Sequence, residues 1–212
     1  MTLPSDHEYA VLGGVSRASI GRYLTIASST VSGVLVFLVL QAVNLAKAFG
    51  WNANLPPTVM SLLGASAVYG GMYWILKNYA WKWTVFNKFL KVPNLAGVWD
   101  CQGQTLDIDG NVTYTWTAEI SIVQCWDMLR IRLKTAQSGS NSIAAALTHD
   151  SVDGWILLYQ YRNDPRNDQP QLRSHVGCSA VTISKDLKSA TAEYFNGGGR
   201  ATFGKMTWTR RA

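Results

Sequence analysis

Several features that identify common classes of protein are scarce in this sequence. The three cysteines, Cys101, Cys125 and Cys178, are widely spaced and form no C-x-x-C pair, so neither a disulfide framework nor a zinc site is predicted. The three histidines are isolated from one another, and no G-x-S-x-G, H-E-x-x-H or Walker motif is present. We therefore predict that the chain is not an enzyme and has no cofactor.

Acidic residues are scarce in the first part of the chain. Residues 1–92 contain seven of the 19 basic residues but only two of the 13 acidic ones, Asp6 and Glu8. Basic residues that flank apolar stretches are typical of membrane proteins, whereas a protein that binds nucleic acid gathers them on one face. We expect membrane lipid as a partner, and no DNA or RNA polymer.

No charged residue lies between Arg22 and Lys47. A helix of this length crosses the roughly 30 Å of hydrocarbon in a bilayer. We predict a first transmembrane helix over residues 23–46, preceded by a cytoplasmic N-terminal segment of residues 1–22. A soluble helix would need polar residues at helical spacing on its outer face, and this stretch has none.

A second transmembrane helix is predicted over residues 58–76, after the break marked by Pro56-Pro57. This stretch is less apolar and has about the minimum length for a span. The short turn of residues 47–57 makes the two helices an antiparallel hairpin. Four small residues would allow either the first helix or a helix of another chain to approach closely: Gly64, Ser66, Gly70 and Gly71.

Basic residues indicate the orientation of this hairpin. They precede the first helix and follow the second, and only Lys47 lies near the turn. The positive-inside rule then places both termini in the cytoplasm. The segment of residues 77–92 is basic and aromatic, with Tyr79, Trp81 and Trp83, as expected where a helix leaves the lipid.

From Leu95 onward the composition shifts to Val, Ile, Thr, Tyr and Trp, which favours β-strands. Residues 93–212 are predicted to form an all-β domain whose strands are Gly97–Asp107, Val112–Gln124, Met128–Ala136, Asn141–His149, Gly154–Asn163, Arg173–Ile183, Ser189–Asn196 and Arg200–Arg210. Eight antiparallel strands joined by tight turns can close an up-and-down β-barrel with room for one small ligand. A two-sheet sandwich is the alternative, because the number of strands does not establish closure.

Alternation along the strands groups polar and aromatic residues on shared faces. Tyr159, Tyr161 and Asn163 share one face, and Arg200 and Thr202 share another. If these faces point inward, they suit a planar base attached to phosphate. The residue types alone favour an ordinary barrel core. The glycine run before Arg200 lacks the G-K-[ST] ending of a phosphate-binding loop, so we interpret it as a hairpin turn.

Four short motifs carry a resemblance to a known family: Asn94-Leu95-Ala96-Gly97-Val98-Trp99, Gln124-Cys125-Trp126, Tyr159-Gln160-Tyr161-Arg162-Asn163 and Tyr194-Phe195-Asn196-Gly197-Gly198-Gly199-Arg200. In this order, behind two spans, they resemble the effectors of CBASS, the cyclic-oligonucleotide-based antiphage signalling system. Those effectors join two transmembrane helices to a β-barrel, an architecture that covers nearly the whole chain.

The resemblance implies that a partner nucleotidyltransferase, a CD-NTase, makes a cyclic dinucleotide during phage infection and that the cytoplasmic barrel binds it. Binding would promote self-assembly in the bacterial inner membrane, which disrupts the membrane and kills the infected cell. On this hypothesis the tyrosines and tryptophans stack on the bases, the arginine offsets phosphate charge and the other groups donate or accept hydrogen bonds. The candidate pocket residues are Trp99, Trp116, Tyr161, Asn163, His175, Tyr194, Arg200 and Thr202.

Two other functions fit the same sequence. A membrane-tethered carrier of a small apolar ligand would have an apolar interior without a cation. A module that recruits proteins to the membrane would have a filled barrel and an exposed apolar patch.

Overall fold

The computed structural model divides the chain into two compact units, a helical unit of residues 15–83 and a β unit formed by the preceding residues together with residues 84–212. The structure describes residues 6–51, 54, 56, 60, 64–150, 152, 154–166, 168, 173–198 and 200–211, without the side chains of residues 87 and 88.

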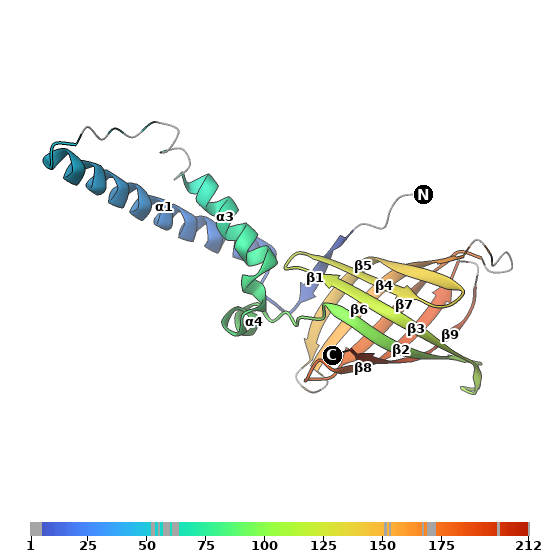
Figure 1. Cartoon of the computed structure of the whole chain (residues 1–212). Coiled ribbons are helices and arrows are strands. Elements are labelled where there is room, and N and C mark those ends of the chain that lie inside the picture. The colour runs from blue at the N-terminus through green and yellow to red at the C-terminus, as the bar shows by residue number, and fades with distance from the viewer. Residues whose placement is uncertain are drawn as a thin grey trace. The chain divides into compact units, whose positions relative to one another are not determined.

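The helical unit begins with α1 (Arg17–Ala48), a helix of 32 residues (Figure 1). At 1.5 Å per residue it is about 48 Å long, more than enough to cross a bilayer. It starts before the predicted residue 23 because Ser16 caps it: the Ser16 hydroxyl accepts the backbone N–H of Ser19 at 3.1 Å. Within the described part of the chain, α1 is the one helix long and apolar enough to span a membrane.

Helix α1 packs against α3 (Ala65–Asn78). A Cβ atom placed on Gly21 of α1 would lie 3.9 Å from the hydroxyl oxygen of Tyr69, and the small residues Ser28 and Ser32 of α1 are also buried. A short 3₁₀ turn, η1 (Ala80–Lys82), follows α3. The predicted second span of residues 58–76 overlaps α3, but residues 57–59 and 61–63 lie outside the described part, as does much of the predicted turn.

Large apolar side chains of α1 are exposed. Phe37, Leu38 and Leu45 each expose more than half of their surface, at 58%, 55% and 61%. A water-soluble helix would cover or replace such residues, whereas lipid solvates them. The helical unit therefore has the surface of a membrane segment.

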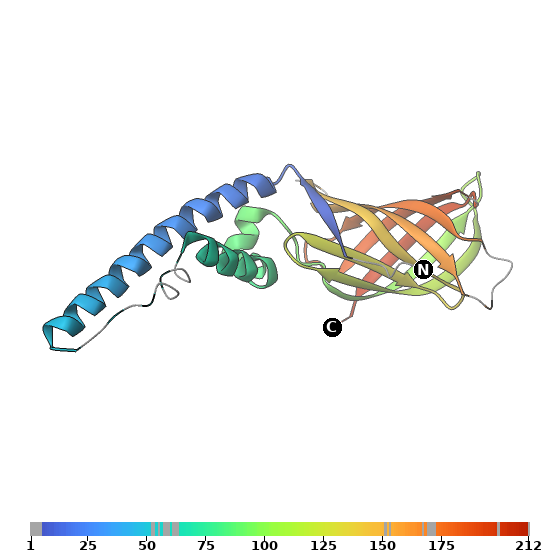
Figure 2. The same ribbon diagram turned by 90° about the horizontal axis from the view of Figure 1, so that it is seen from above.

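The β unit is a closed barrel of nine strands (Figures 1 and 2). The strands are β1 (His7–Leu12), β2 (Gly97–Leu106), β3 (Val112–Gln124), β4 (Met128–Lys134), β5 (Ser138–Asp150), β6 (Gly154–Pro165), β7 (His175–Ile183), β8 (Ser189–Gly197) and β9 (Phe203–Arg210). From β2 to β9 each strand pairs antiparallel with the next one, and β2 pairs with β9. Closure rules out the sandwich alternative.

The ninth strand corrects the prediction of an eight-stranded, wholly antiparallel barrel. Strand β1 lies in the segment that was predicted to precede the membrane as residues 1–22. It pairs antiparallel with β4, His7 opposite Leu129, and parallel with β5, Tyr9 opposite Ala145. Strands β4 and β5 pair directly only over three residues each, so β1 fills the space between them beyond that point.

The stretch that leads into β2 fills one end of the barrel. It follows the mostly exposed helix α4 (Thr84–Leu90) and comprises Leu90 and residues 91–96, in which Leu90, Val92 and Leu95 are fully buried. The Gln124 side chain accepts the backbone N–H of Leu95 at 2.8 Å and donates to the carbonyl of Pro93 at 3.1 Å. The β unit therefore starts earlier than the predicted residue 93.

Candidate functional site

A cavity of about 530 Å³ occupies the half of the barrel away from this filled end. Its walls come from the end of β2, the start of β3 and the turn between β4 and β5. The end of β6, the start of β7, the end of β8 and the start of β9 complete the wall. The volume is within the range of pockets that hold one small organic ligand. The residues around it are mainly aromatic, hydroxyl and amide side chains.

All but one of the candidate pocket residues line this cavity: Trp116, Tyr161, Asn163, His175, Tyr194, Arg200 and Thr202. The exception is Trp99, which also points inward but lies at the filled end of the barrel. Its indole N–H donates to the carbonyl of Leu95 at 3.1 Å, and its ring packs edge-on against Trp208 with 6.3 Å between ring centroids. Trp99 therefore holds the filled end together and does not border the cavity.

Two aromatic pairs form part of the cavity wall. Trp116 and Tyr194 meet edge to face with their centroids 5.9 Å apart, and Tyr159 and Tyr161 lie 5.7 Å apart. Burial raises the pKa of the Tyr161 phenol, Tyr194 adds to that shift, and the positive charge of Arg200 opposes it. Burial likewise raises the pKa of Tyr159. Both phenols are therefore neutral at physiological pH and can donate hydrogen bonds.

A chain of hydrogen bonds fixes the polar side of the cavity. The Tyr161 hydroxyl donates to Asn196 Oδ1 at 2.8 Å, and Asn196 Nδ2 donates to the Thr202 hydroxyl at 2.8 Å. The Thr105 and Tyr194 hydroxyls are 2.9 Å apart. These bonds hold the side chains in defined orientations before any ligand arrives.

The same residues position the arginine. The backbone N–H of Asn196 donates to the carbonyl of Thr202 at 2.8 Å and closes the turn that carries Arg200. Arg200 is exposed at the edge of the cavity and makes no hydrogen bond or ion pair with any residue that the structure describes. Its guanidinium is therefore available to an anion.

Two polar side chains offer further hydrogen bonds to a ligand. The amide of Asn163 has no partner among the described residues, although the residue is 8% exposed. The Nδ1–H of His175 donates to the carbonyl of Arg173 at 3.1 Å, which leaves Nε2 without a partner among the described residues. Together they present donors and acceptors to the edge of a planar group.

The charge of the lining favours an anion. Among the described residues that line the cavity, Arg200 is the only one with a permanent charge, and no carboxylate is present. A negative ligand thus meets one cation and no like charge. Nor do the described residues contain a group of His, Cys, Asp or Glu side chains suited to a metal ion.

Sequence reasoning missed several lining residues, among them Thr105, Ser140 and Asn196. Asn196 lies two residues after Tyr194 on β8, so alternation along the strand puts both on one face, and this signal could have identified Asn196. Thr105 and Ser140 are small polar residues: the aromatic signal on the strand of Thr105 was Trp99, at the other end of β2, and the strand of Ser140 has no aromatic residue.

Two parts of the chain match models of known domain families. Residues 18–82 match "Cap15, TM helices" and residues 90–210 match "Cap15, cyclic dinucleotide receptor domain". The chain belongs to the Cap15 family. It is 45% identical over 206 residues to CD-NTase-associated protein 15 of Yersinia aleksiciae, with 97% of each chain covered.

Membership of the Cap15 family confirms the resemblance to CBASS antiphage effectors. The receptor domain of the family coincides with the barrel from its filled end to β9, and therefore with the cavity. The transmembrane helices of the family coincide with the helical unit, whose apolar helix α1 has the length of a span. The Cap15 family thus accounts for both units of the chain.

Proposed function

We propose that the cavity binds one cyclic dinucleotide made by a CD-NTase, and that binding promotes self-assembly of the chain and disruption of the inner membrane. The observation that carries this proposal is the cavity itself. It combines aromatic faces for bases, free amide and imidazole groups for base edges, and a single cation for phosphate. It lies within the part of the chain that matches a cyclic dinucleotide receptor domain.

Within the pocket we assign the bases to the rings of Trp116, Tyr161 and Tyr194. Stacking of a base on an aromatic ring is worth about 1–3 kcal/mol. Asn163, His175 and Thr202 would hydrogen-bond base, sugar or phosphate groups. Arg200, at the cavity edge, would pair with a phosphate, since a guanidinium matches the geometry of two phosphate oxygens.

The cavity argues against the two competing functions. A carrier of an apolar ligand would have an apolar interior, whereas this wall carries hydroxyl and amide groups and a cation at its edge. A recruitment module would have a filled barrel. Here only one end is filled, and the other holds about 530 Å³ of open space.

We also propose that the chain crosses the bacterial inner membrane twice, with both termini and the barrel in the cytoplasm. The matched family describes more than one transmembrane helix in residues 18–82. Basic residues gather before the first predicted span and after the second, in the two segments that this topology places in the cytoplasm. In α4, Val85, Phe86 and Phe89 are exposed apolar residues directly after the matched helices, which suits contact with the lipid surface.

Self-assembly is proposed to use the small residues of α3. A Cβ atom added to Gly70 or Gly71 would meet no heavy atom within 4 Å, so these glycines do not pack against α1 in the single chain. The open surface at these positions would let a helix of a second chain approach closely.

Calorimetric titration of the full chain in detergent with a panel of cyclic dinucleotides and their linear counterparts tests the receptor assignment. We expect selective binding of a cyclic species by the unsubstituted chain. We expect Arg200→Ala to weaken that binding by roughly tenfold or more, as for the loss of a charge-assisted hydrogen bond. Arg162→Ala, which removes an exposed arginine from the outer face of β6, is the matched control.

Two outcomes would count against the proposal. If a folded chain binds no cyclic dinucleotide, the cavity is not the receptor site. If Arg200→Ala retains full affinity, Arg200 has no role in phosphate binding.

A further inference from the structure

Two of the aromatic residues that line the cavity each face a glycine on the neighbouring strand. Trp116 of β3 is directly opposite Gly103 of β2, and Tyr161 of β6 is directly opposite Gly177 of β7. Glycine within a strand is unfavourable, by about 0.5–1 kcal/mol relative to alanine, and often marks a close approach of another group. Both glycines point into the barrel and are buried.

The rings occupy the space where side chains would otherwise lie. A Cβ atom on Gly103 would be 2.2, 2.3 and 2.5 Å from three atoms of the Trp116 indole, Cε2, Cζ2 and Cδ2. Three atoms of one ring system at nearly equal distances mean that the face of the indole covers the glycine. A Cβ atom on Gly177 would be 2.5 Å from both Cζ and the hydroxyl oxygen of Tyr161, and 2.7 Å from Asn196 Oδ1.

These distances are too short for any real Cβ atom, so an alanine at either position would displace the ring. The barrel wall lies behind the ring, and the free direction of movement is into the cavity. Displacement of Trp116 would disturb its contact with Tyr194, and displacement of Tyr161 would break its 2.8 Å hydrogen bond to Asn196.

We infer that Gly103 and Gly177 are positioning residues for ligand binding. They let the Trp116 indole lie flat on the wall and the hydroxyl end of Tyr161 lie close to it, which keeps the cavity open and leaves both rings available to the ligand. This inference rests on the proposed function, because the ligand is the cyclic dinucleotide assigned to the cavity. It adds that the glycines opposite the rings, and not the rings alone, set the shape of the pocket.

Two other glycines of the same sheet differ from this pair: one is required by the sheet backbone, and the other has no close neighbour. Gly204 faces Tyr194, but a Cβ atom there would lie only 1.9 Å from the carbonyl oxygen of Gln104, so Gly204 is required by the backbone of the sheet itself. Gly197 of β8 points outward, and a Cβ atom there would meet nothing within 4 Å. Gly197→Ala is therefore the matched control.

The test is calorimetric titration of the full chain in detergent with the cyclic dinucleotide that the unsubstituted chain binds. We expect Gly103→Ala and Gly177→Ala to bind it roughly tenfold more weakly, the size of effect that follows from losing one base–aromatic contact. Gly197→Ala should bind as the unsubstituted chain does. All three variants should keep a cooperative thermal transition, since alanine is compatible with a strand.

A double-mutant cycle distinguishes positioning from a general effect on the fold. In a Trp116→Leu background the ring is absent, so adding Gly103→Ala should cause no further loss of affinity. An additive loss in that background, or unchanged affinity for both glycine variants in the native background, would overturn the inference.

Near-ultraviolet circular dichroism detects a displacement of the Trp116 ring in the absence of a ligand. We expect Gly103→Ala to change the aromatic spectrum and Gly197→Ala to leave it unchanged. If the unsubstituted chain binds no cyclic dinucleotide, the proposed function fails on that result alone. An unchanged aromatic spectrum for Gly103→Ala would instead overturn the positioning role.

Discussion

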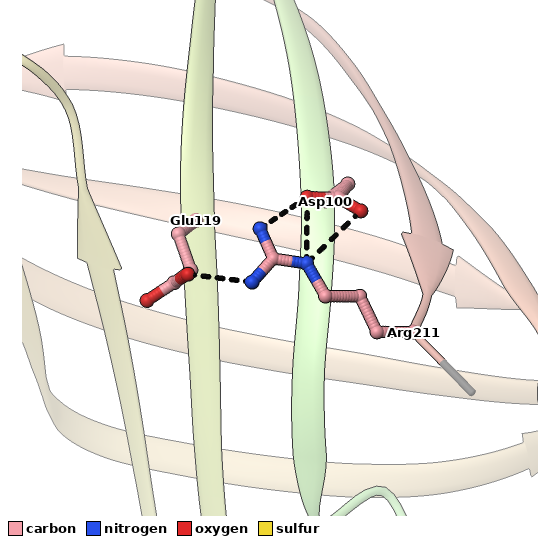
Figure 3. Close-up of polar contacts among 3 residues, drawn as sticks. All are labelled: Asp100, Glu119 and Arg211. Carbon is pink, nitrogen blue, oxygen red and sulfur yellow. Dashed lines mark hydrogen bonds and ion pairs between the residues drawn. The ribbon is translucent and has the colours of Figure 1, made fainter.

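Arg211 connects the end of the chain to the outer surface of the barrel. Its guanidinium donates to Asp100 of β2, with a shortest distance of 2.6 Å, and to Glu119 of β3 at 2.7 Å (Figure 3). Asp100 and Glu119 are directly opposite each other in the sheet, where two like charges would repel. Arg211 offsets that repulsion and ties both strands to the segment after β9.

This cluster predicts a pH-dependent contribution to stability. The side-chain hydrogen bond from Arg211 lowers the pKa of Asp100 below its ordinary value of 3.8 in the folded chain. The stabilisation is therefore fully present above pH 3.8 and is lost as the pH falls through the lower, folded pKa. We expect Arg211→Ala to lower the melting temperature slightly at neutral pH, because the ion pairs are exposed and screened.

Thermal denaturation of the full chain in detergent at a series of pH values measures this effect. The difference between Arg211→Ala and the unsubstituted chain should shrink toward zero at acidic pH. Arg162→Ala, on the outer face of β6, should show no such dependence. A difference that stays constant with pH would mean that Arg211 acts through packing and not through the carboxylates.

At the residue scale, alternation along a strand predicted which residues share a face, but neither which face points inward nor where a residue lies along the barrel axis. It grouped Tyr161 with Asn163, and both line the cavity. Trp99 also points inward, yet it lies at the filled end, because a period of two says nothing about the position of a residue along the barrel axis. The glycines opposite Trp116 and Tyr161 gave no signal, since their role depends on pairing with another strand.

At the scale of elements, the eight strands with turn signals were predictable and β1 was not. Strand β1 is six residues long and pairs with β4 and β5, which lie more than a hundred residues further along the chain. No turn links β1 to either partner, so local sequence carries no trace of the pairing. The extent of the second predicted span stays a prediction, because much of it lies outside the described residues.

The contacts of β1 predict that it is part of the folded core. Tyr9 is 2% exposed, and its hydroxyl donates to the carbonyl of Trp126 at 3.1 Å. The Gln124 side chain, which holds the segment before β2, donates to the Tyr9 hydroxyl at 3.4 Å. We expect Tyr9→Ala to lower the free energy of unfolding by about 3–5 kcal/mol, as for other buried aromatic residues.

Chemical denaturation followed by near-ultraviolet circular dichroism measures this loss. Glu8→Ala removes an exposed side chain from the same strand and should change the free energy of unfolding by less than about 0.5 kcal/mol. Equal stability of Tyr9→Ala and Glu8→Ala would show that β1 is not an integral part of the barrel.

For the whole molecule, the sequence predicted a membrane part and a β part, but the structure divides the chain between these two parts at other residues than predicted. The prediction assigned residues 1–92 to the membrane part and residues 93–212 to the barrel. In the structure the β unit takes strand β1 from before α1 and helix α4 from after the helical unit. The helical unit is therefore an insertion between two pieces of the barrel, which composition alone did not indicate.

This arrangement determines how binding can be separated from toxicity. The two points where the chain leaves the β unit are close together: a Cβ atom on Gly14 would lie 3.6 Å from the carbonyl oxygen of Leu90, the last residue of α4. Helix α4 is only about 10 Å long at 1.5 Å per residue. A flexible Gly-Ser linker of about ten residues can therefore replace residues 15–83, because an extended chain spans roughly 3.3 Å per residue.

We expect this linked barrel to bind the cyclic dinucleotide as tightly as the full chain and to leave cell growth unaffected when the partner nucleotidyltransferase is active. The cavity and every residue that closes it remain in the linked barrel, whereas α1, the apolar helix with the length of a membrane span, is gone. Growth of cells that express equal amounts of either form, together with calorimetry on the purified proteins, measures both properties. Continued toxicity of the linked barrel would remove membrane disruption by the helices from the mechanism, and a folded linked barrel without affinity would place the receptor site outside the β unit.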